Sequence, residues 1–328
     1  MKSLSSSAMH AARKGRRGAT VGLGIILALV GACAAPEEGR APEAPAAGVV
    51  SLAALPKGHR ELWSAWLAAA EGAAGRAAWE EARRAALADP ALGAFLVDNL
   101  LRQLVRAWDR SQLASTGHLP GPFERARGEL VRLGSPAVPT LVELMAMADG
   151  SVALLAADTL AEIGAPSLLP TAVLLEREAR ASRRRAVELL GRLPAADDEV
   201  AIVAALGRRL VRDDEWVVRA QAARAIGLRG GFSRERGAAR SVLVRGLTDP
   251  ETNVRRECAG ALAALGDPRV IPALIDALGR AVASGQPGEL PALRAALKGL
   301  SGGREFTSLA AWRGWWSAAG AERVRAAG

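Results

Sequence analysis

Apolar residues in the segment 58–113 recur with a period close to that of an α-helix. They fall in three stripes, each of which would cover one helix face: Leu62, Trp63, Trp66 and Leu67; Trp79, Ala82 and Ala86; and Leu92, Phe95, Leu96, Leu100, Leu104 and Trp108. Because recurrence near 3.6 residues is typical of an amphipathic helix, we expect three helices that form an N-terminal cap with tryptophans in its core. The residues 114–122, rich in Gly, Pro and Ser, predict a linker after this cap.

From residue 123 the chain is periodic, with pairs of amphipathic helices separated by a short recurring turn. In each turn an apolar residue closes a helix, and in five of the six turns glycine or proline follows as a stop or a new start. The turns fall at Leu133-Gly134, Ile163-Gly164, Leu193-Pro194, Ile226-Gly227, Leu265-Gly266 and Leu300-Ser301. The turns recur at intervals of 30 to 39 residues. Recurrence at this interval predicts a solenoid, in which each helix pair buries its apolar face against the next pair. The extra segment 229–236 is expected to lengthen the turn of its unit.

One unit of this array carries a specific sequence pattern. Asp249 precedes its first helix, Val254-Arg255 lies within that helix, and Gly266-Asp267-Pro268 separates the two helices. This unit resembles a HEAT repeat closely, and the preceding unit echoes it with Asp214 and Val218-Arg219.

The resemblance implies an all-α fold, an α-solenoid of about six HEAT-like helix pairs over residues 123–318, followed by a C-terminal tail at 319–328. It also implies that the second helix of each pair lines a concave surface, where partners commonly bind. Near the end of the array, Trp312, Trp315 and Trp316 share one helix face. We expect that face to cover the open end of the final repeat.

The first 32 residues are predicted to be a leader that lies outside the fold. A basic segment precedes an apolar run at 19–30, which is too short to cross the hydrocarbon core of a membrane. The run ends in Val30-Gly31-Ala32-Cys33, which resembles the lipobox of bacterial lipoproteins. The resemblance implies diacylglycerol on the Cys33 thiol, cleavage before Cys33 and acylation of the new N-terminus. An ordinary signal peptide with an incidental cysteine, and an uncleaved anchor, stay open as alternatives.

The residues 33–57, which begin with a stretch rich in Pro, Glu and Ala, predict a flexible tether between the lipid and the folded body. Two or more acyl chains would hold the protein firmly on a membrane. The residue that follows the cysteine is Ala34, and not Asp. By resemblance to the lipoprotein sorting pattern of Gram-negative bacteria, this favours the periplasmic face of the outer membrane if the cell is Gram-negative.

The net charge of +9 does not point to nucleic acid once the leader is set apart. Removal of five basic leader residues leaves 38 of the 43 Lys and Arg against 34 acidic residues, a net charge of +4. We therefore expect no nucleic-acid partner. Cys258 has no partner for a disulfide after lipidation of Cys33, and it lies on an apolar helix stripe. It is predicted to be a small buried hydrophobe with an ordinary or raised pKa.

Motifs for catalysis or metal binding do not stand out in the sequence. His59 and His118 are isolated, and no Gly-rich phosphate loop follows a strand. The acidic run Asp197-Asp198-Glu199 falls at a helix start, where carboxylates are favoured by the helix dipole. We therefore predict no catalytic residue, no metal and no cofactor.

Arginines are the candidate partner-binding residues. We expect seven of them to lie on the inner surface of the solenoid: Arg177, Arg180, Arg208, Arg209, Arg212, Arg240 and Arg245. Because guanidinium groups bind carboxylate and phosphate in a bidentate way, one hypothesis is a groove that binds an acidic peptide, protein or envelope polymer. The other is that these arginines are merely solvated, since acidic residues such as Glu176 and Asp213 are interspersed.

Taken together, these features predict an exported, lipid-anchored, monomeric protein that acts as a non-catalytic scaffold or adaptor for unidentified protein partners. If the arginines form a binding groove, these partners are acidic. HEAT-like repeats also occur in phycobilin lyases, so a lyase-like or enzyme-accessory protein that binds a small molecule stays open. A structural component of the cell envelope is the third alternative.

Overall fold

The computed structural model describes residues 53, 55–68, 73–114, 121–147, 150–230, 236–285 and 287–326. All regular secondary structure in these ranges is α-helix or 3-10 helix, which confirms the all-α solenoid prediction. The chain divides into two compact units, Met1–Pro170 and Thr171–Gly328. Cys33, the leader and most of the expected tether lie outside the described residues.

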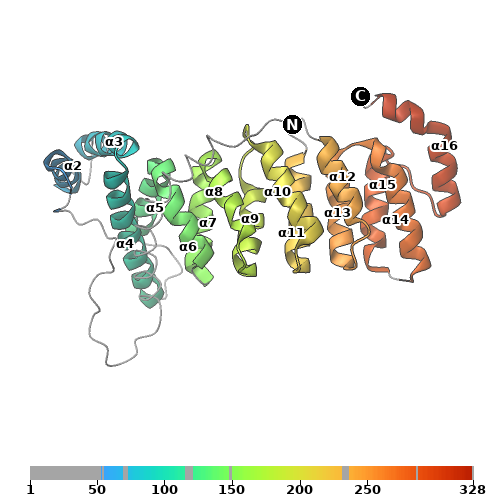
Figure 1. The fold of residues 1–328 in the computed structure, drawn as a ribbon, viewed down its shortest axis with the longest axis horizontal. Coiled ribbons are helices and arrows are strands. Elements are labelled where there is room, and N and C mark those ends of the chain that lie inside the picture. Colours follow the sequence, from blue (N-terminus) through green and yellow to red (C-terminus); the bar gives the residue numbers. More distant parts are fainter. Residues whose placement is uncertain are drawn as a thin grey trace, which may run out of the picture. The chain divides into compact units, whose positions relative to one another are not determined.

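Unit 1 is built from helices that each pack on a neighbour along the chain (Figure 1). They are α2 (Lys57–Ala68), α3 (Ala73–Ala88), α4 (Pro90–Ala114), α5 (Gly121–Leu133), η2 (Ser135–Ala137), α6 (Val138–Met147), α7 (Gly150–Ile163) and η3 (Ala165–Ser167). The short helix α8 (Leu168–Val173) contains the division between the units. The first three helices match the expected N-terminal cap.

Long apolar side chains on α4 form the core of the cap. Leu92, Leu96 and Leu100 are fully buried, because residues three or four apart lie on one helix face. Trp63 of α2 packs edge-on against Phe95, with ring centroids 5.2 Å apart. Trp63 is buried, as is Trp79 of α3, which confirms that these two tryptophans belong to the core.

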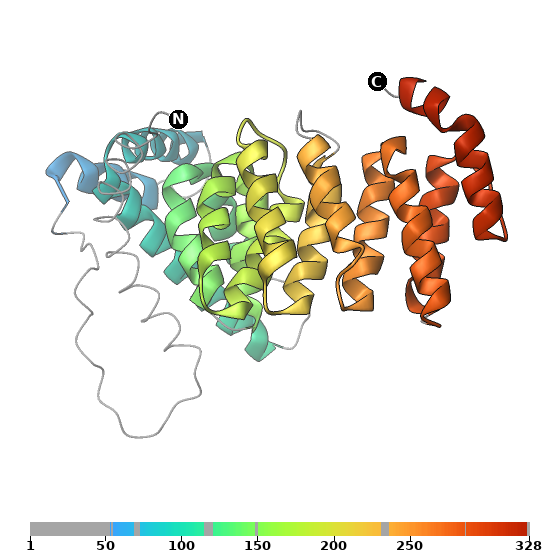
Figure 2. The same cartoon turned by 45° about the vertical axis from the view of Figure 1, so that its right-hand side comes forward.

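Unit 2 stacks pairs of helices one after another (Figure 2), and the first helices of successive pairs contact one another. The first-helix row contains α9 (Arg180–Arg192), α11 (Trp216–Gly230), α13 (Thr252–Leu265) and α15 (Leu290–Leu300). The second-helix row contains α10 (Glu199–Arg212), α12 (Arg236–Gly246), α14 (Ile271–Ala283) and α16 (Leu309–Ala326). Short 3-10 segments complete the unit: η4 (Leu174–Glu176), η5 (Pro268–Val270) and η6 (Pro287–Glu289).

Five of the six predicted turns fall where a helix ends. Gly134, Gly164 and Gly266 follow α5, α7 and α13, and all three have positive φ angles, of 70°, 81° and 67°. An L side chain rarely takes this conformation, so glycine is the natural stop there. The other two confirmed turns follow α9 and α15.

The predicted turn at Ile226-Gly227 is wrong. Helix α11 continues through Gly227 to Gly230, and the expected turn extension therefore begins inside a helix. A Cβ atom on Gly227 would lie 2.7 Å from Cα of Ala261 on α13. Glycine at this position allows α11 to pack closely against α13. In the sequence, a glycine after an apolar residue has the same pattern as a helix stop.

The C-terminal helix α16 packs against α14, as expected of a cap over the last repeat. Trp312 is buried and meets Phe306 edge-on, with ring centroids 4.8 Å apart. The prediction of a separate tail at 319–328 is corrected, because α16 continues as far as Ala326.

Candidate partner-binding surface

A ladder of ion pairs joins successive first helices of unit 2. Arg183 on α9 holds Asp213 through two contacts, Nε to Oδ2 at 2.7 Å and Nη2 to Oδ1 at 2.9 Å. Arg219 on α11 makes the same bidentate contact with Asp249, Nε to Oδ2 at 2.8 Å and Nη2 to Oδ1 at 3.0 Å. Arg255 on α13 donates through Nε to Glu289 at 2.5 Å. Each arginine therefore reaches the acid that precedes the next first helix.

The same arginines also tie down the chain before their own helices. Arg219 donates to the carbonyl oxygens of Asp213 and Asp214, at 3.0 and 3.3 Å. Arg255 does so to Asp249 and Pro250, both at 2.8 Å. Since a planar guanidinium offers five donors in a fixed fork, one side chain can fix both its own repeat and the next one.

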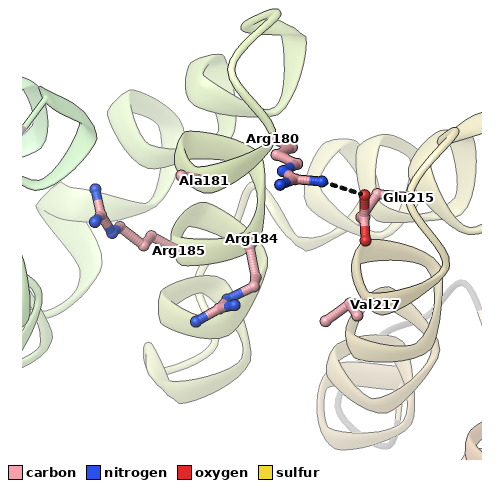
Figure 3. Close-up of a pocket in the computed structure, with 6 residues that line it drawn as sticks. All are labelled: Arg180, Ala181, Arg184, Arg185, Glu215 and Val217. Carbon is pink, nitrogen blue, oxygen red and sulfur yellow. Dashed lines mark hydrogen bonds and ion pairs between the residues drawn. The ribbon is translucent and has the colours of Figure 1, made fainter. Parts of the chain in front are cut away.

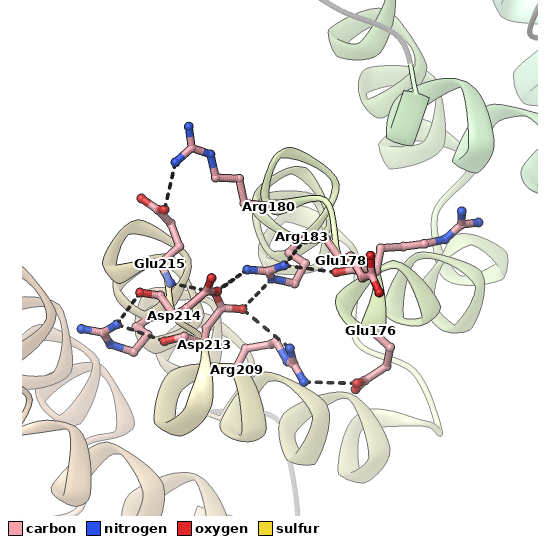
Figure 4. A network of polar contacts seen from close by, with 10 residues as sticks. Glu176, Glu178, Arg180, Arg183, Arg209, Asp213, Asp214 and Glu215 are labelled. Carbon is pink, nitrogen blue, oxygen red and sulfur yellow. Dashed lines mark hydrogen bonds and ion pairs between the residues drawn. The ribbon is translucent and has the colours of Figure 1, made fainter.

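Electrostatics around the first rung agree with this geometry (Figure 4). Burial by itself would raise the pKa of Asp213, but hydrogen bonds from Arg183 and from the Glu215 backbone outweigh it and hold that pKa below its ordinary value of 3.8. The hydrogen bond with Asp213 raises the pKa of Arg183. Both groups are thus kept charged.

A second buried pair lies between Arg229, near the end of α11, and Glu199, at the start of α10. Arg229 Nε donates to Glu199 Oε2 at 2.9 Å, and Nη1 donates to the Leu193 carbonyl at 2.9 Å. The side chains are only 3% and 8% exposed. Asp198 is the N-cap residue of α10 and Glu199 lies in its first turn, so the acidic run stands at a helix start as predicted; Asp198 makes no side-chain capping hydrogen bond, and Glu199 also pairs with Arg229.

Residues 203–285 match the family model described as HEAT repeats. No curated protein matches the chain. The matched segment runs from within α10 through α14 and includes the Arg219–Asp249 rung, whereas Arg183 and Glu289 of the other two rungs fall outside it.

The structure does not gather the seven predicted arginines on one helix row of the HEAT-like array. Arg177 lies outside any helix, and Arg180 begins α9 in the first-helix row, which corrects their assignment to second helices. The other five lie on α10 and α12.

Most of these arginines already have acidic partners. Arg208 and Arg209 reach Glu176 at 3.5 and 3.1 Å, and Arg240 reaches Asp267 at 2.6 Å. Arg212 and Arg245 are exposed, without an ion-pair partner in the described part of the chain. The second-helix row is therefore a surface of mixed charge and not a continuous cationic one.

Groups suited to metal binding do not cluster in the described ranges. No set of three or more His, Cys, Asp or Glu side chains there could hold a metal ion. Cys258 is fully buried, and its burial raises its pKa, as the sequence predicted. His59 lies 3.3 Å from Asp89, and His118 falls outside the described residues.

No single described helix is both long and apolar enough to cross a membrane. The bent pair Phe123–Leu133 and Ser135–Met147, at an angle of 105°, meets the length and composition limits only when both helices are taken together.

Proposed function

We propose that the protein is a membrane-anchored, non-catalytic scaffold or adaptor for other proteins at the bacterial cell envelope. The observation that carries the proposal is the run of three ion-pair rungs, from Arg183 to Glu289, within a HEAT-like stack. HEAT repeats generally mediate contacts between proteins. A repeat stack whose neighbours are fixed in register offers a partner an extended, preformed surface, which lowers the ordering cost of binding.

The anchor part of the proposal rests on the sequence around Cys33. A basic leader, a short apolar run, a small-residue segment and a cysteine occur in that order, and a Pro- and Glu-rich stretch follows. Lipid on Cys33 would place the folded units within a tether's length of the membrane surface, outside the cytoplasm. Such a position favours a protein that recruits or holds partners at the envelope.

Expression of the full chain in a Gram-negative host, with a C-terminal tag, tests the anchor. We expect the mature protein to begin at Cys33, to carry acyl chains by mass spectrometry and to fractionate with membranes. Cys33→Ser should lose the acyl mass and leave the membrane fraction. Membrane association that persists unchanged in Cys33→Ser would contradict the anchor.

Affinity capture of the tagged protein from cross-linked membranes tests the scaffold. The control is a reporter that carries residues 1–57 alone, which retains the anchor and the tether. We expect at least one protein to be enriched with the full chain over this control, and to retrieve the chain in a reciprocal capture. Equal recovery with both baits would contradict the scaffold.

A further inference from the structure

Two hollows follow one another along the seam between α9 and α11, with volumes of about 320 and 270 Å³. The first lies where the two helices begin and is lined by Arg180, Arg184 and Val217 among others (Figure 3). The second continues along the same two helices and is lined by Gly191, Arg224 and Leu228 among others. We refer to the two together as the α9–α11 groove.

The floor of the groove is apolar and formed by small residues. A Cβ atom on Gly191 would lie 3.4 Å from Cβ of Ala225, so the two helices meet closely there. Leu228 stands beside this contact with 53% of its surface exposed, and Val217 is half-buried. Exposed apolar side chains next to a shallow floor gain free energy when a partner covers them.

The rims of the groove carry an excess of positive charge. The charged residues that line the two hollows are five arginines and two glutamates. Glu215 contacts Arg180 at 3.3 Å. Arg184 and Arg224 are exposed and have no ion-pair partner within the described ranges. This distinguishes the groove from α10, where Glu176 neutralises Arg208 and Arg209.

We propose that the α9–α11 groove binds an acidic segment of a partner protein that also carries apolar side chains. This inference rests on the proposed scaffold function and names the chemistry of its partner. Carboxylates would pair with Arg184 and Arg224, and apolar side chains would cover Val217 and Leu228. The groove follows α9 for about 18 Å at roughly 1.5 Å per residue, which is the length of about five or six residues of extended chain.

An acidic protein segment fits the groove better than an anionic polymer does. Polyphosphate and lipid headgroups would satisfy the arginines alone and would leave Leu228 exposed. A peptide that alternates Glu and Leu satisfies both features, because carboxylates and apolar groups then fall at neighbouring positions.

Fluorescence anisotropy with the detergent-solubilised full chain tests the groove. The probe is a labelled peptide of about eight residues that alternates Glu and Leu, compared with versions in which Gln replaces Glu or Ser replaces Leu. The test variant is Arg184→Glu with Arg224→Glu. The control is Arg212→Glu with Arg245→Glu, which makes the same change of charge at two exposed, unpaired arginines of the second-helix row.

We expect the test variant to weaken binding of the Glu–Leu peptide at least about tenfold, and the control variant to weaken it less than about threefold. Both altered peptides should bind more weakly than the Glu–Leu peptide. Equal weakening by the two variants, equal binding of the Ser version, or no binding to the unaltered protein would each overturn the inference. Displacement of the peptide by polyphosphate or anionic vesicles at equal charge concentration would also overturn it, in favour of an anionic polymer or surface.

Capture from membranes separates this inference from the scaffold function on which it rests. If the groove variant retrieves the same partners as the unaltered protein, the groove assignment fails and the scaffold stands. If the peptide binds as expected but the full chain enriches no protein over the anchor control, the scaffold function fails. The groove then still stands as a site that binds carboxylates and apolar side chains. Loss of those partners in the groove variant alone supports both.

Discussion

The two units of the chain are stabilised by different kinds of contact. In unit 1 the long helix α4 contributes a line of fully buried leucines, and ion pairs such as Arg102–Asp98 leave one partner 37% exposed. In unit 2 the helix pairs are joined through buried charges. Arg183 and Asp213 are 7% and 0% exposed, and Arg229 and Glu199 are 3% and 8% exposed.

This difference bears on how each unit fixes the register of its helices. Apolar burial is non-directional and tolerates some sliding of one helix along another. A bidentate arginine–carboxylate pair is directional and holds only at one register. We infer that unit 1 depends on the volume of its side chains, and unit 2 on charged pairs and on close helix approaches.

The largest effect is expected at the buried pair of unit 2. Glu199→Leu would leave the Arg229 guanidinium buried without its carboxylate, although three backbone carbonyls still accept from it. We expect a loss of about 3–5 kcal/mol in the free energy of unfolding, because an uncompensated buried charge is costly. Urea unfolding read by hydrogen exchange of α10 and α11 amides measures this loss.

The matched control is the double variant Glu199→Leu with Arg229→Met. It removes both charges, so it should recover most of the stability lost in the single variant. In unit 1, Leu100→Ala should cost about 2–5 kcal/mol through loss of burial and a cavity, with no charge involved. A double variant as unstable as Glu199→Leu would contradict the role assigned to the pair.

A smaller effect is expected at the closest helix approach in unit 2. Gly227→Ala places a methyl group 2.7 Å from Cα of Ala261 and must push α11 away from α13. We expect a loss of about 1–3 kcal/mol from this overpacking. Gly260→Ala and Gly128→Ala are the controls, since nothing lies within 4 Å of a Cβ atom at either position.

The controls should instead gain up to about 1 kcal/mol, because alanine favours a helix over glycine. Gly260 lies on α13 of unit 2 and Gly128 on α5 of unit 1. Thermal unfolding of the three variants measures the differences. A loss at all three glycines would mean that helix packing at Gly227 is not special.

The repeat architecture could be predicted from the sequence because it depends on local patterns. Apolar spacing predicted the helices, and glycine or proline after an apolar residue predicted four of the six ends, with Ser301 marking a fifth. Gly227 misled this reading, because the same residue type serves a helix stop and a close helix approach. Only the short distance between Gly227 and Ala261 in the folded protein distinguishes a close helix approach from a helix stop.

The ion pairs could not be predicted in the same way. Asp249 and Arg255 were recognised as marks of a HEAT-like unit, but their partners lie 30 and 34 residues away along the chain. Such pairing depends on how neighbouring repeats stack, which a single repeat does not encode. The row of Arg180 was predicted wrongly for a related reason, since the boundary of α9 decides to which row this residue belongs.

The smallest expected effect is a change in stability whose dependence on pH differs between the two units. In unit 1, burial raises the pKa of Glu129 above its ordinary value of 4.5, although Arg132 opposes this, and Oε2 has no hydrogen-bond partner among the described residues. The charged carboxylate therefore reduces stability at neutral pH. Glu129→Gln should raise the free energy of unfolding by about 1 kcal/mol or less at pH 7, a gain that disappears as the pH falls below 4.5.

Unit 2 should respond to acid in the opposite direction. Because the pKa of Asp213 is below 3.8 in the folded state, its contribution is complete above that value and is lost as the pH falls through the lowered pKa. Hydrogen exchange of the two units across pH 7 to 3, with rates corrected for intrinsic pH dependence, measures both effects. If Glu129→Gln instead lowers the protection of α5 at pH 7 and this loss disappears as the pH falls, the hydrogen bond from Arg132 to the charged carboxylate outweighs the cost of burial. Unit 1 would then depend on a charged pair as unit 2 does, and the contrast between the units would fail at that site.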